Sequence, residues 1–129
     1  MRLKEKTAVV TGAASGFGEG IARKFVAEGA QVLLADLNVD GAERLAEELG
    51  PNAIAIEANV AQDAGVLAMA ERAIQAFGRI DILVNNAGTT HLPAELETIT
   101  DEDFDKVFAV NCKSVYLTGK HIVPLMKQA

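Results

Sequence analysis

The sequence has few aromatic residues: it contains no tryptophan, one tyrosine and five phenylalanines among its 129 residues. Half of the residues are nevertheless hydrophobic, so the apolar content comes mainly from Ala, Val, Leu and Ile. These residue types are typical of a sheet buried between helices and not of an aromatic binding surface. A chain of this length and composition is expected to form one globular domain.

Other absences exclude several classes of protein. The single cysteine, Cys112, cannot form an internal disulfide. No apolar run approaches the roughly 18 residues of a membrane span, and no signal peptide is recognisable, so we expect a cytoplasmic location. The net charge of −6, with no Lys/Arg stripe, argues against a nucleic-acid partner. No spacing among His, Cys, Asp and Glu indicates a metal site.

Short apolar runs alternate with segments of helical period along the chain. The runs predict buried strands at residues 7–11, 31–35, 53–57 and 80–84. We expect Gly29 and Gly78 to end the first and third helices, and Asp63 to cap the start of the third. Thr100 and Asp103 resemble a capping box that opens a long last helical segment, with a break near Asn111.

Strand–helix alternation with continuously apolar strands predicts an α/β fold, a doubly wound parallel sheet of the Rossmann type with helices on both faces. Right-handed crossovers give the strand order 3-2-1-4. The pattern covers residues 1–129 without an internal repeat or a linker.

Glycines at the first strand–helix junction predict a phosphate-binding turn. Gly12, Gly16 and Gly18 follow the spacing G-x-x-x-G-x-G, which allows a tight turn and close approach of the backbone to a pyrophosphate. The helix N-terminus then presents free N–H groups to the phosphates, and the Ser15 hydroxyl adds a donor. A glycine-rich turn without a ligand is the alternative.

Asp36 stands at the end of the second predicted strand, where an acidic residue accepts hydrogen bonds from a ribose 2′-hydroxyl. A carboxylate there repels a 2′-phosphate, and the neighbouring Ala13, Ala14 and Leu37 carry no positive charge. The sequence therefore favours NAD over NADP. The alternative is that Asp36 only caps the turn into Asn38.

Three motifs together resemble the short-chain dehydrogenase/reductase family. The glycine pattern is matched by Thr11 to Gly18, the N-N-A-G signature stands at Asn85 to Gly88, and a helix-breaking Asn is matched by Asn111. The resemblance covers the whole chain and implies the N-terminal, cofactor-binding half of an NAD-dependent oxidoreductase. It also implies a small alcohol or ketone substrate and a homodimer or homotetramer.

The resemblance assigns roles to individual residues. Asn59 stands where the family usually has Asp against the adenine; its amide oxygen can still accept from the adenine amino group, without a charge. Asn111 is expected to hold a water in the proton-relay path, and Asn85 to tie the central strands together. The residues expected to bind the cofactor are Gly12, Ser15, Gly16, Phe17, Gly18, Asp36, Asn59, Val60, Asn86, Ala87 and Gly88.

The family's catalytic Ser and Tyr-x-x-x-Lys lie beyond a fifth strand, and residues 1–129 show no such strand. Tyr116 and Lys120 have the Tyr-x-x-x-Lys spacing but follow Asn111 on the same helical segment. We therefore interpret Tyr116 as a packing residue and Lys120 as an exposed charge. His91 is expected in a solvated loop or at a substrate cleft, and His121 packed or facing water.

These residues alone are expected to be inactive and marginally stable, because the fourth strand would have an unpaired edge. Two alternatives to an oxidoreductase remain: a catalytically inactive NAD-binding module, and a structural fragment that oligomerises through its last helices.

Overall fold

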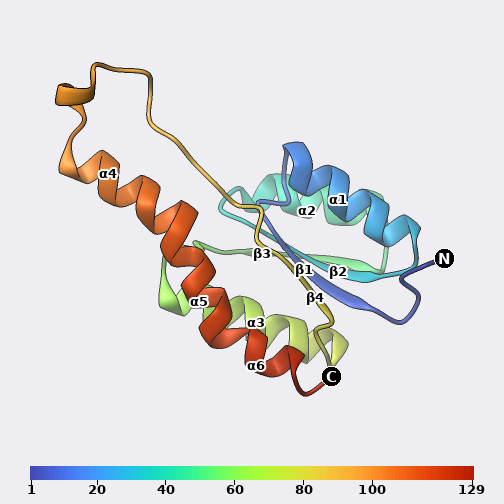
Figure 1. Cartoon of the computed structure of the whole chain (residues 1–129). Coiled ribbons are helices and arrows are strands. Elements are labelled where there is room, and N and C mark those ends of the chain that lie inside the picture. The colour runs from blue at the N-terminus through green and yellow to red at the C-terminus, as the bar shows by residue number, and fades with distance from the viewer.

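The computed structural model describes residues 1–129 as a four-stranded parallel sheet with helices on both faces (Figure 1). The strand order is β3-β2-β1-β4, which confirms the order 3-2-1-4 expected from the sequence. The strands are β1 (Thr7–Thr11), β2 (Gln31–Asp36), β3 (Ala53–Glu57) and β4 (Ile82–Val84). The helices are α1 (Gly16–Ala27), α2 (Val39–Leu49), α3 (Asp63–Phe77), α4 (Asp101–Phe108), α5 (Ser114–His121) and α6 (Val123–Met126).

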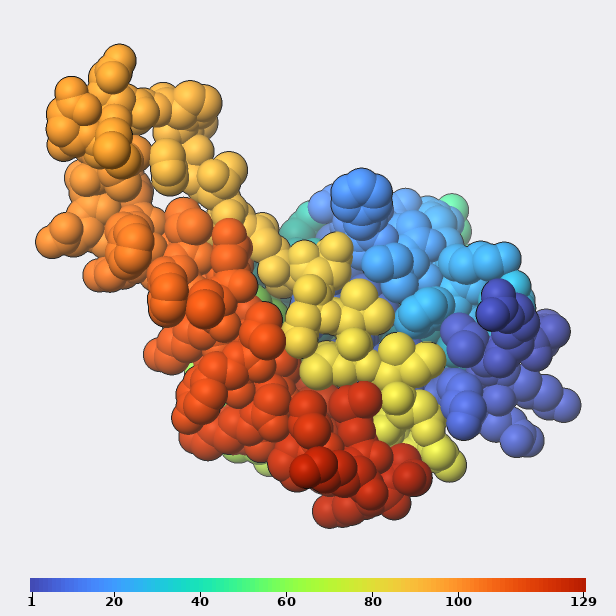
Figure 2. Space-filling model, in the orientation of Figure 1, coloured from blue at the N-terminus to red at the C-terminus, as the bar shows by residue number.

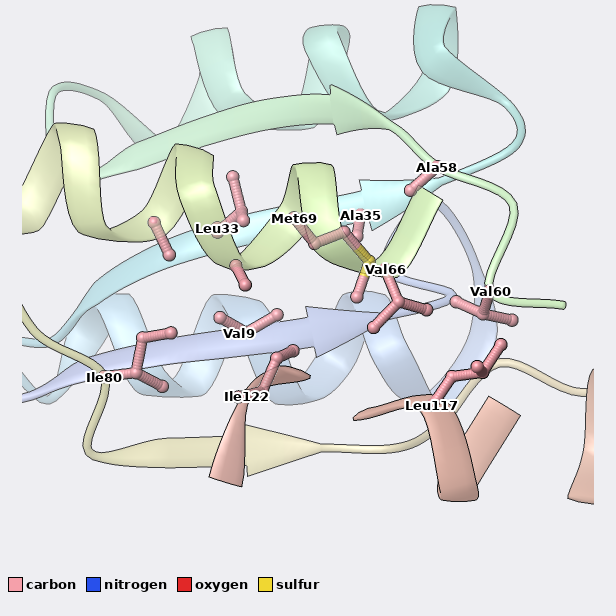
Figure 3. Packing of buried hydrophobic residues seen from close by; sticks show 12 residues of the cluster. Val9, Leu33, Ala35, Ala58, Val60, Val66, Met69, Ile80, Leu117 and Ile122 are labelled. Atoms are coloured by element: carbon pink, nitrogen blue, oxygen red, sulfur yellow. The ribbon is translucent and has the colours of Figure 1, made fainter. Parts of the chain in front are cut away.

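Alternate side chains of the central strands build two separate cores. Val9 and Leu33 point to the face covered by α3 and α5, where they pack with Met69, Leu117 and Ile122 (Figure 3). The opposite face is covered by α1 and α2 and is built from these buried residues: Ala8, Val10, Val32, Leu34, Ala22, Ala42 and Leu45. Every residue of β1 is buried, because the central strand of a doubly wound sheet is covered on both faces.

The helix boundaries follow local sequence signals. Gly29 and Gly78 adopt positive φ angles of 93° and 80° just after α1 and α3, as expected of glycines that end helices. The Thr100 hydroxyl accepts from Asp103 N at 3.1 Å, which confirms the predicted cap of α4. The break near Asn111 is also confirmed: residues Ala109–Lys113 form a π-helical turn between α4 and α5.

Two details differ from the sequence predictions. The fourth strand begins at Ile82: the backbone N–H of Asp81 donates to the carbonyl oxygen of Thr7 at 2.9 Å, but Thr7 N donates to the Asp81 carboxylate. Asp63 is the first residue of α3 and does not cap it; Gln62 occupies the cap position without a side-chain bond. The carboxylate of Asp63 instead pairs with Lys120 and His121 of α5, at 3.1 and 2.9 Å.

The segment from Thr89 through α4 stands clear of the sheet as an arm (Figures 1 and 2). Its side chains are mostly exposed, including Leu92, Leu96 and Phe104. At the other end of the last helical segment, Leu117 and Ile122 are buried against α3. The last helical segment therefore has an exposed half, α4, and a packed half that contains Leu117 and Ile122, and the π-helical turn joins the two halves.

Candidate dinucleotide site

A cleft of about 360 Å³ opens at the carboxyl ends of β1, β2, β3 and β4. This is the edge of an open α/β sheet at which ligands bind, next to the point where the strand order reverses. Its size is within the range of small-molecule sites. The lining residues are Gly12, Ser15, Ala35, Asp36, Leu37, Ala58, Asn59, Val60, Asn86, Ala87, Gly88, Thr89, Lys106 and Val110.

The glycine turn brings three chain segments into close contact. Gly12 has a φ of +64°, and a Cβ atom there would lie 2.9 Å from the Cα of Ala87 and from Nδ2 of Asn86. A Cβ atom on Gly18 would lie 2.2 Å from the carbonyl oxygen of Gly12. Only glycine fits at these two positions, so the first turn of α1 can pack directly on the end of β1.

The start of α1 carries backbone donors without acceptors. None of the N–H groups of Ser15, Gly16, Phe17 and Gly18 donates a hydrogen bond within the chain. Unpaired N–H groups and the positive end of the helix dipole together favour an anion at this position. The turn therefore has the features of a binding site for an anionic group such as a phosphate.

Asp36 is held in place by two backbone donors. Its carboxylate oxygens accept from Ala14 N and from Asn38 N, both at 2.9 Å. The turn-capping role that the sequence left open is therefore real. Each oxygen has further lone pairs, and Asp36 is the only acidic residue that lines the cleft.

Asn86, and not Asn85, ties the end of β4 to the end of β1. Nδ2 of Asn86 donates to the carbonyl oxygens of Thr11 and Gly12 at 3.1 and 3.2 Å. Asn85 accepts a 3.0 Å hydrogen bond from Thr118 of α5, so the role predicted for Asn85 is wrong. Asn85 and Asn86 have different partners because successive residues at a strand end point to opposite faces of the sheet.

The hydroxyl of Thr11 is a second element of this junction that the sequence analysis did not single out. It accepts from the backbone N–H groups of Asn86 and Ala87, both at 3.0 Å, and lies 3.3 Å from the carbonyl oxygen of Val84. The position of Thr11 at the end of the first predicted strand, inside the glycine motif, is the sequence feature that could have indicated this role.

Lys106 of α4 was also missed. It is the only basic residue in the cleft lining and forms no ion pair. Lys106 lies four residues before Val110, which also lines the cleft, so helical spacing places both on one face. The predicted helix contained this signal, but the sequence did not show which face of α4 turns toward the sheet.

Of the predicted cofactor residues, Gly16, Phe17 and Gly18 lie outside the cleft lining. Gly18 is buried beneath the turn, and the side chain of Phe17 is 87% exposed. Asn111 lies on the π-helical turn next to the cleft, and its amide pairs with the backbone of Thr89. The other predicted cofactor residues all line the cleft.

The remaining chemically notable side chains lie outside this cleft. Tyr116 is 64% exposed, so the prediction that it is a packing residue is wrong. Asp63 raises the pKa of the Lys120 ammonium by a direct ion pair. His91 is exposed in the arm, and His121 pairs with Asp63. No helix in the structure is long and apolar enough to cross a membrane.

The family model for short chain dehydrogenases matches residues 6–129. The chain belongs to the short-chain dehydrogenase family. The structure agrees closely with a crystal structure of a 3-ketoacyl-(acyl-carrier-protein) reductase from Brucella melitensis complexed with NADH. The TM-score is 0.95 with 44% identity, over 98% of this chain and 52% of that one.

Three further proteins are similar to nearly the whole of this chain. A member from Burkholderia phymatum in complex with NAD has a TM-score of 0.91 and 33% identity, over 98% of this chain and 46% of that one. Among curated relatives, 4-formylbenzenesulfonate dehydrogenase of Comamonas testosteroni is 44% identical over 131 residues, 99% of this chain and 52% of that protein. Galactitol 2-dehydrogenase of Agrobacterium fabrum is 40% identical over 126 residues, 98% of this chain and 49% of that protein.

The chain spans about half the length of the short-chain dehydrogenases that it matches. Similar proteins with NAD or NADH bound support a nicotinamide cofactor for this family member. The names of these relatives describe aldehyde, polyol and ketoacyl chemistry, and they differ from one another.

Proposed function

We propose that this chain supplies the NAD-binding part of an oxidoreductase that transfers a hydride between the nicotinamide and an alcohol or carbonyl substrate. The observation that carries the proposal is the set of unpaired N–H groups at the start of α1, beside a cleft that contains Asp36. Gly12 and Ser15 would border the pyrophosphate, and Asp36 the adenosine ribose. Bound NAD would supply the hydride acceptor; the chain's own residues hold and orient it.

NAD is proposed in preference to NADP because of the charge of Asp36. A 2′-phosphate would stand next to this carboxylate, whereas a free 2′-hydroxyl donates to it. Lys106 is the only cation in the lining, and it stands on α4 rather than beside Asp36 at the end of β2. A cofactor without the phosphate therefore fits the charges of this end of the cleft better.

The resemblance assigns Asn111 to the proton-relay path, and we retain this assignment as part of the proposal. The Asn111 amide already exchanges two hydrogen bonds with Thr89. An amide has two N–H donors and two oxygen lone pairs. One donor and one lone pair therefore remain for a water molecule.

Residues 1–129 are proposed to be insufficient for turnover by themselves. The Lys120 ammonium is paired with Asp63 and Tyr116 is exposed away from the cleft lining, so these two residues do not provide a catalytic pair. Substrate-binding and proton-transfer groups would come from further residues of the full-length protein. We also propose a cytoplasmic homodimer or homotetramer acting on a small alcohol or ketone.

The test is titration of the full-length protein with NAD and NADP by calorimetry, followed by turnover assays with a panel of alcohols. We expect NAD to bind more tightly, and Asp36→Asn to reduce the NAD/NADP preference by about tenfold, since a hydrogen bond to a charged group is involved. Asp40→Asn, an exposed acid on α2, is the matched control. NAD binding without turnover would indicate an inactive binding module, and no binding at all would reject the proposal.

A further inference from the structure

The π-helical turn between α4 and α5 contains no residue that breaks a helix by itself. Its five residues, Ala109–Lys113, include neither proline nor glycine, although these residues are common causes of a helix break. The backbone N–H of Ser114 donates to the carbonyl oxygen of Ala109, five residues earlier. In an α-helix this N–H would donate to Val110, four residues earlier. The change of register therefore takes from Val110 its usual backbone donor.

The hydroxyl of Ser114 replaces this donor. Its Oγ donates to the carbonyl oxygen of Val110 at 2.6 Å. Ser114 is only 5% exposed, so little water can compete for the bond. A serine hydroxyl that bonds to the carbonyl group four residues earlier is a known cause of helix bending. Ser114 thus donates from both its backbone and its side chain where the register changes, and both bonds stabilise the π-helical turn.

The π-helical turn determines where the side chain of Asn111 points. Asn111 is the middle residue of the turn, and its amide exchanges two hydrogen bonds of 2.7 Å with the backbone of Thr89. A Cβ atom on Gly88, which lines the cleft, would lie 3.5 Å from Oδ1 of Asn111. Each residue of an α-helix turns through about 100°. A return to regular α-helical bonding would therefore rotate Asn111 relative to α5 and away from Thr89.

The packing of α5 prevents this helix from rotating to compensate. Ser114, Leu117 and Thr118 are its buried residues, and Leu117 belongs to the core that α5 shares with α3. Thr118 also donates to Oδ1 of Asn85 at 3.0 Å, which ties α5 to the end of β4. A change of register in the turn would therefore displace Asn111 and α4, and not α5.

We propose that Ser114 is a positioning residue for the reaction: its hydroxyl holds the π-helical turn, and the turn holds the Asn111 amide beside the cleft. Ser114 does not line the cleft, so it acts through Asn111 and not by contact with a cofactor or substrate. The inference rests on the proposed function, in which Asn111 holds a water molecule for proton transfer. Loss of the Ser114 hydroxyl should therefore slow turnover without weakening the binding of NAD.

Substitutions of Ser114 in the full-length protein test this inference. In Ser114→Ala we expect kcat to fall about tenfold, because a displaced positioning group slows the reaction, while KM and the Kd for NAD change by less than about twofold. Hydrogen exchange at the Thr89 amide should accelerate about tenfold. Ser114→Thr keeps a hydroxyl that can bond to the carbonyl group four residues earlier, so it should restore kcat and the slow exchange.

Thr118→Val is the matched control. It removes another buried hydroxyl of α5, which donates to the carbonyl oxygen of Val115 at 3.1 Å and to Asn85. The π-helical turn stays intact in this variant. We expect Thr118→Val to lower the midpoint of urea unfolding, as Ser114→Ala does, but to leave kcat and the exchange at Thr89 unchanged. A general loss of stability in α5 is thereby separated from the loss of positioning.

The outcomes also separate this inference from the proposed function. An unchanged kcat in Ser114→Ala overturns the positioning role, as does an equal fall in Thr118→Val or a failure of Ser114→Thr to restore kcat. If the wild-type protein neither binds NAD nor turns over a substrate, the proposed function fails, and exchange at Thr89 still shows whether Ser114 holds the turn. If Ser114→Ala does not fold, Ser114→Cys, whose thiol is a weaker donor, decides by the same measurements.

Discussion

Asn111 and Thr89 form a reciprocal pair across 22 residues of sequence: Thr89 N donates to Oδ1 of Asn111, and Nδ2 of Asn111 donates to the carbonyl oxygen of Thr89, each at 2.7 Å. Thr89 begins the arm and Asn111 lies in the π-helical turn at the arm's return. The pair therefore closes the base of the arm beside the cleft, where Gly88 and Thr89 form part of the lining.

Replacement of Asn111 by Ala removes both bonds. We expect hydrogen exchange at the Thr89 amide to accelerate about tenfold, with a loss of about 1 kcal/mol in the free energy of unfolding, since both partners are exposed to competing water. Exchange measured by NMR and urea unfolding would report the two effects. Asn52→Ala is the control, because its exposed side chain forms no hydrogen bond. Unchanged exchange at Thr89 would show that the arm is held by other contacts.

Two glycines of α1 provide a matched pair of substitutions. Gly18→Ala places a Cβ atom 2.2 Å from the carbonyl oxygen of Gly12 and 2.5 Å from Nδ2 of Asn86, so we expect a loss of about 1–3 kcal/mol in the free energy of unfolding. Gly20→Ala meets no atom within 4 Å and is expected to gain about 0.5–1 kcal/mol. Urea unfolding measures both. Equal effects of the two substitutions would contradict the tight junction at Gly18.

Asp81 makes the stability of the fold depend on pH. Its carboxylate pairs with Arg79 and accepts from Thr7 N at 2.9 Å. The Arg79 guanidinium first, and the bond from Thr7 N second, hold the pKa of Asp81 below its usual value. A folded-state pKa below the unfolded one stabilises the fold at higher pH, and this contribution disappears as the pH falls below about 4.

Asp81→Asn should therefore lower the free energy of unfolding by about 1–2 kcal/mol at neutral pH, with a difference from wild type that shrinks below about pH 4. Urea unfolding at several pH values measures the difference. Glu71→Gln, at an exposed position of α3 without an ion pair, is the control. A difference that stays constant across this range would show that the charge of Asp81 is not responsible.

The outer face of α4 and the following turn is the surface through which we expect self-association. Phe104 and Phe108 stack with ring centroids 6.1 Å apart and are 62% and 54% exposed. Exposed apolar patches on soluble proteins often mark interaction sites. Replacing both phenylalanines by Asp should reduce the mass of the full-length protein in light scattering to that of a monomer. Leu96→Asp, at an exposed position outside this face, should leave the mass unchanged; an oligomeric double variant would place the interface elsewhere.

The fold was predictable because its signals are local. Apolar runs, helical periods and glycines placed each element, and the right-handed crossover rule ordered the strands. The first residue of β4 was not predictable from local signals, because it depends on a contact between Asp81 and Thr7, which are 74 residues apart in the sequence. The role of Asp63 was mispredicted for the same reason, because its partners, Lys120 and His121, lie far away in the sequence on α5.

Residue types at the site were easier to predict than their bonds. Asp36 and Asn86 line the cleft as expected. Oδ1 of Asn59 accepts from the backbone N–H of Ala61 at 3.0 Å, and this bond was not predictable, because it depends on which backbone N–H group lies near the side chain in three dimensions. Lys106 was missed for a similar reason, since the tilt of α4 relative to the sheet is not encoded in its own periodicity.

β4 is bonded to β1 over only three residues, yet side chains hold it beyond both ends. Before the strand, the Asp81 carboxylate accepts a hydrogen bond from Thr7 N. After it, the side-chain amide of Asn86 donates to the carbonyl oxygens of Thr11 and Gly12. A slip of one residue along β1 would break both attachments at once and turn each β4 side chain to the opposite face. These side chains therefore reinforce the register that the short backbone ladder sets for β4, and with it the spacing between Gly12 and Gly88 across the cleft.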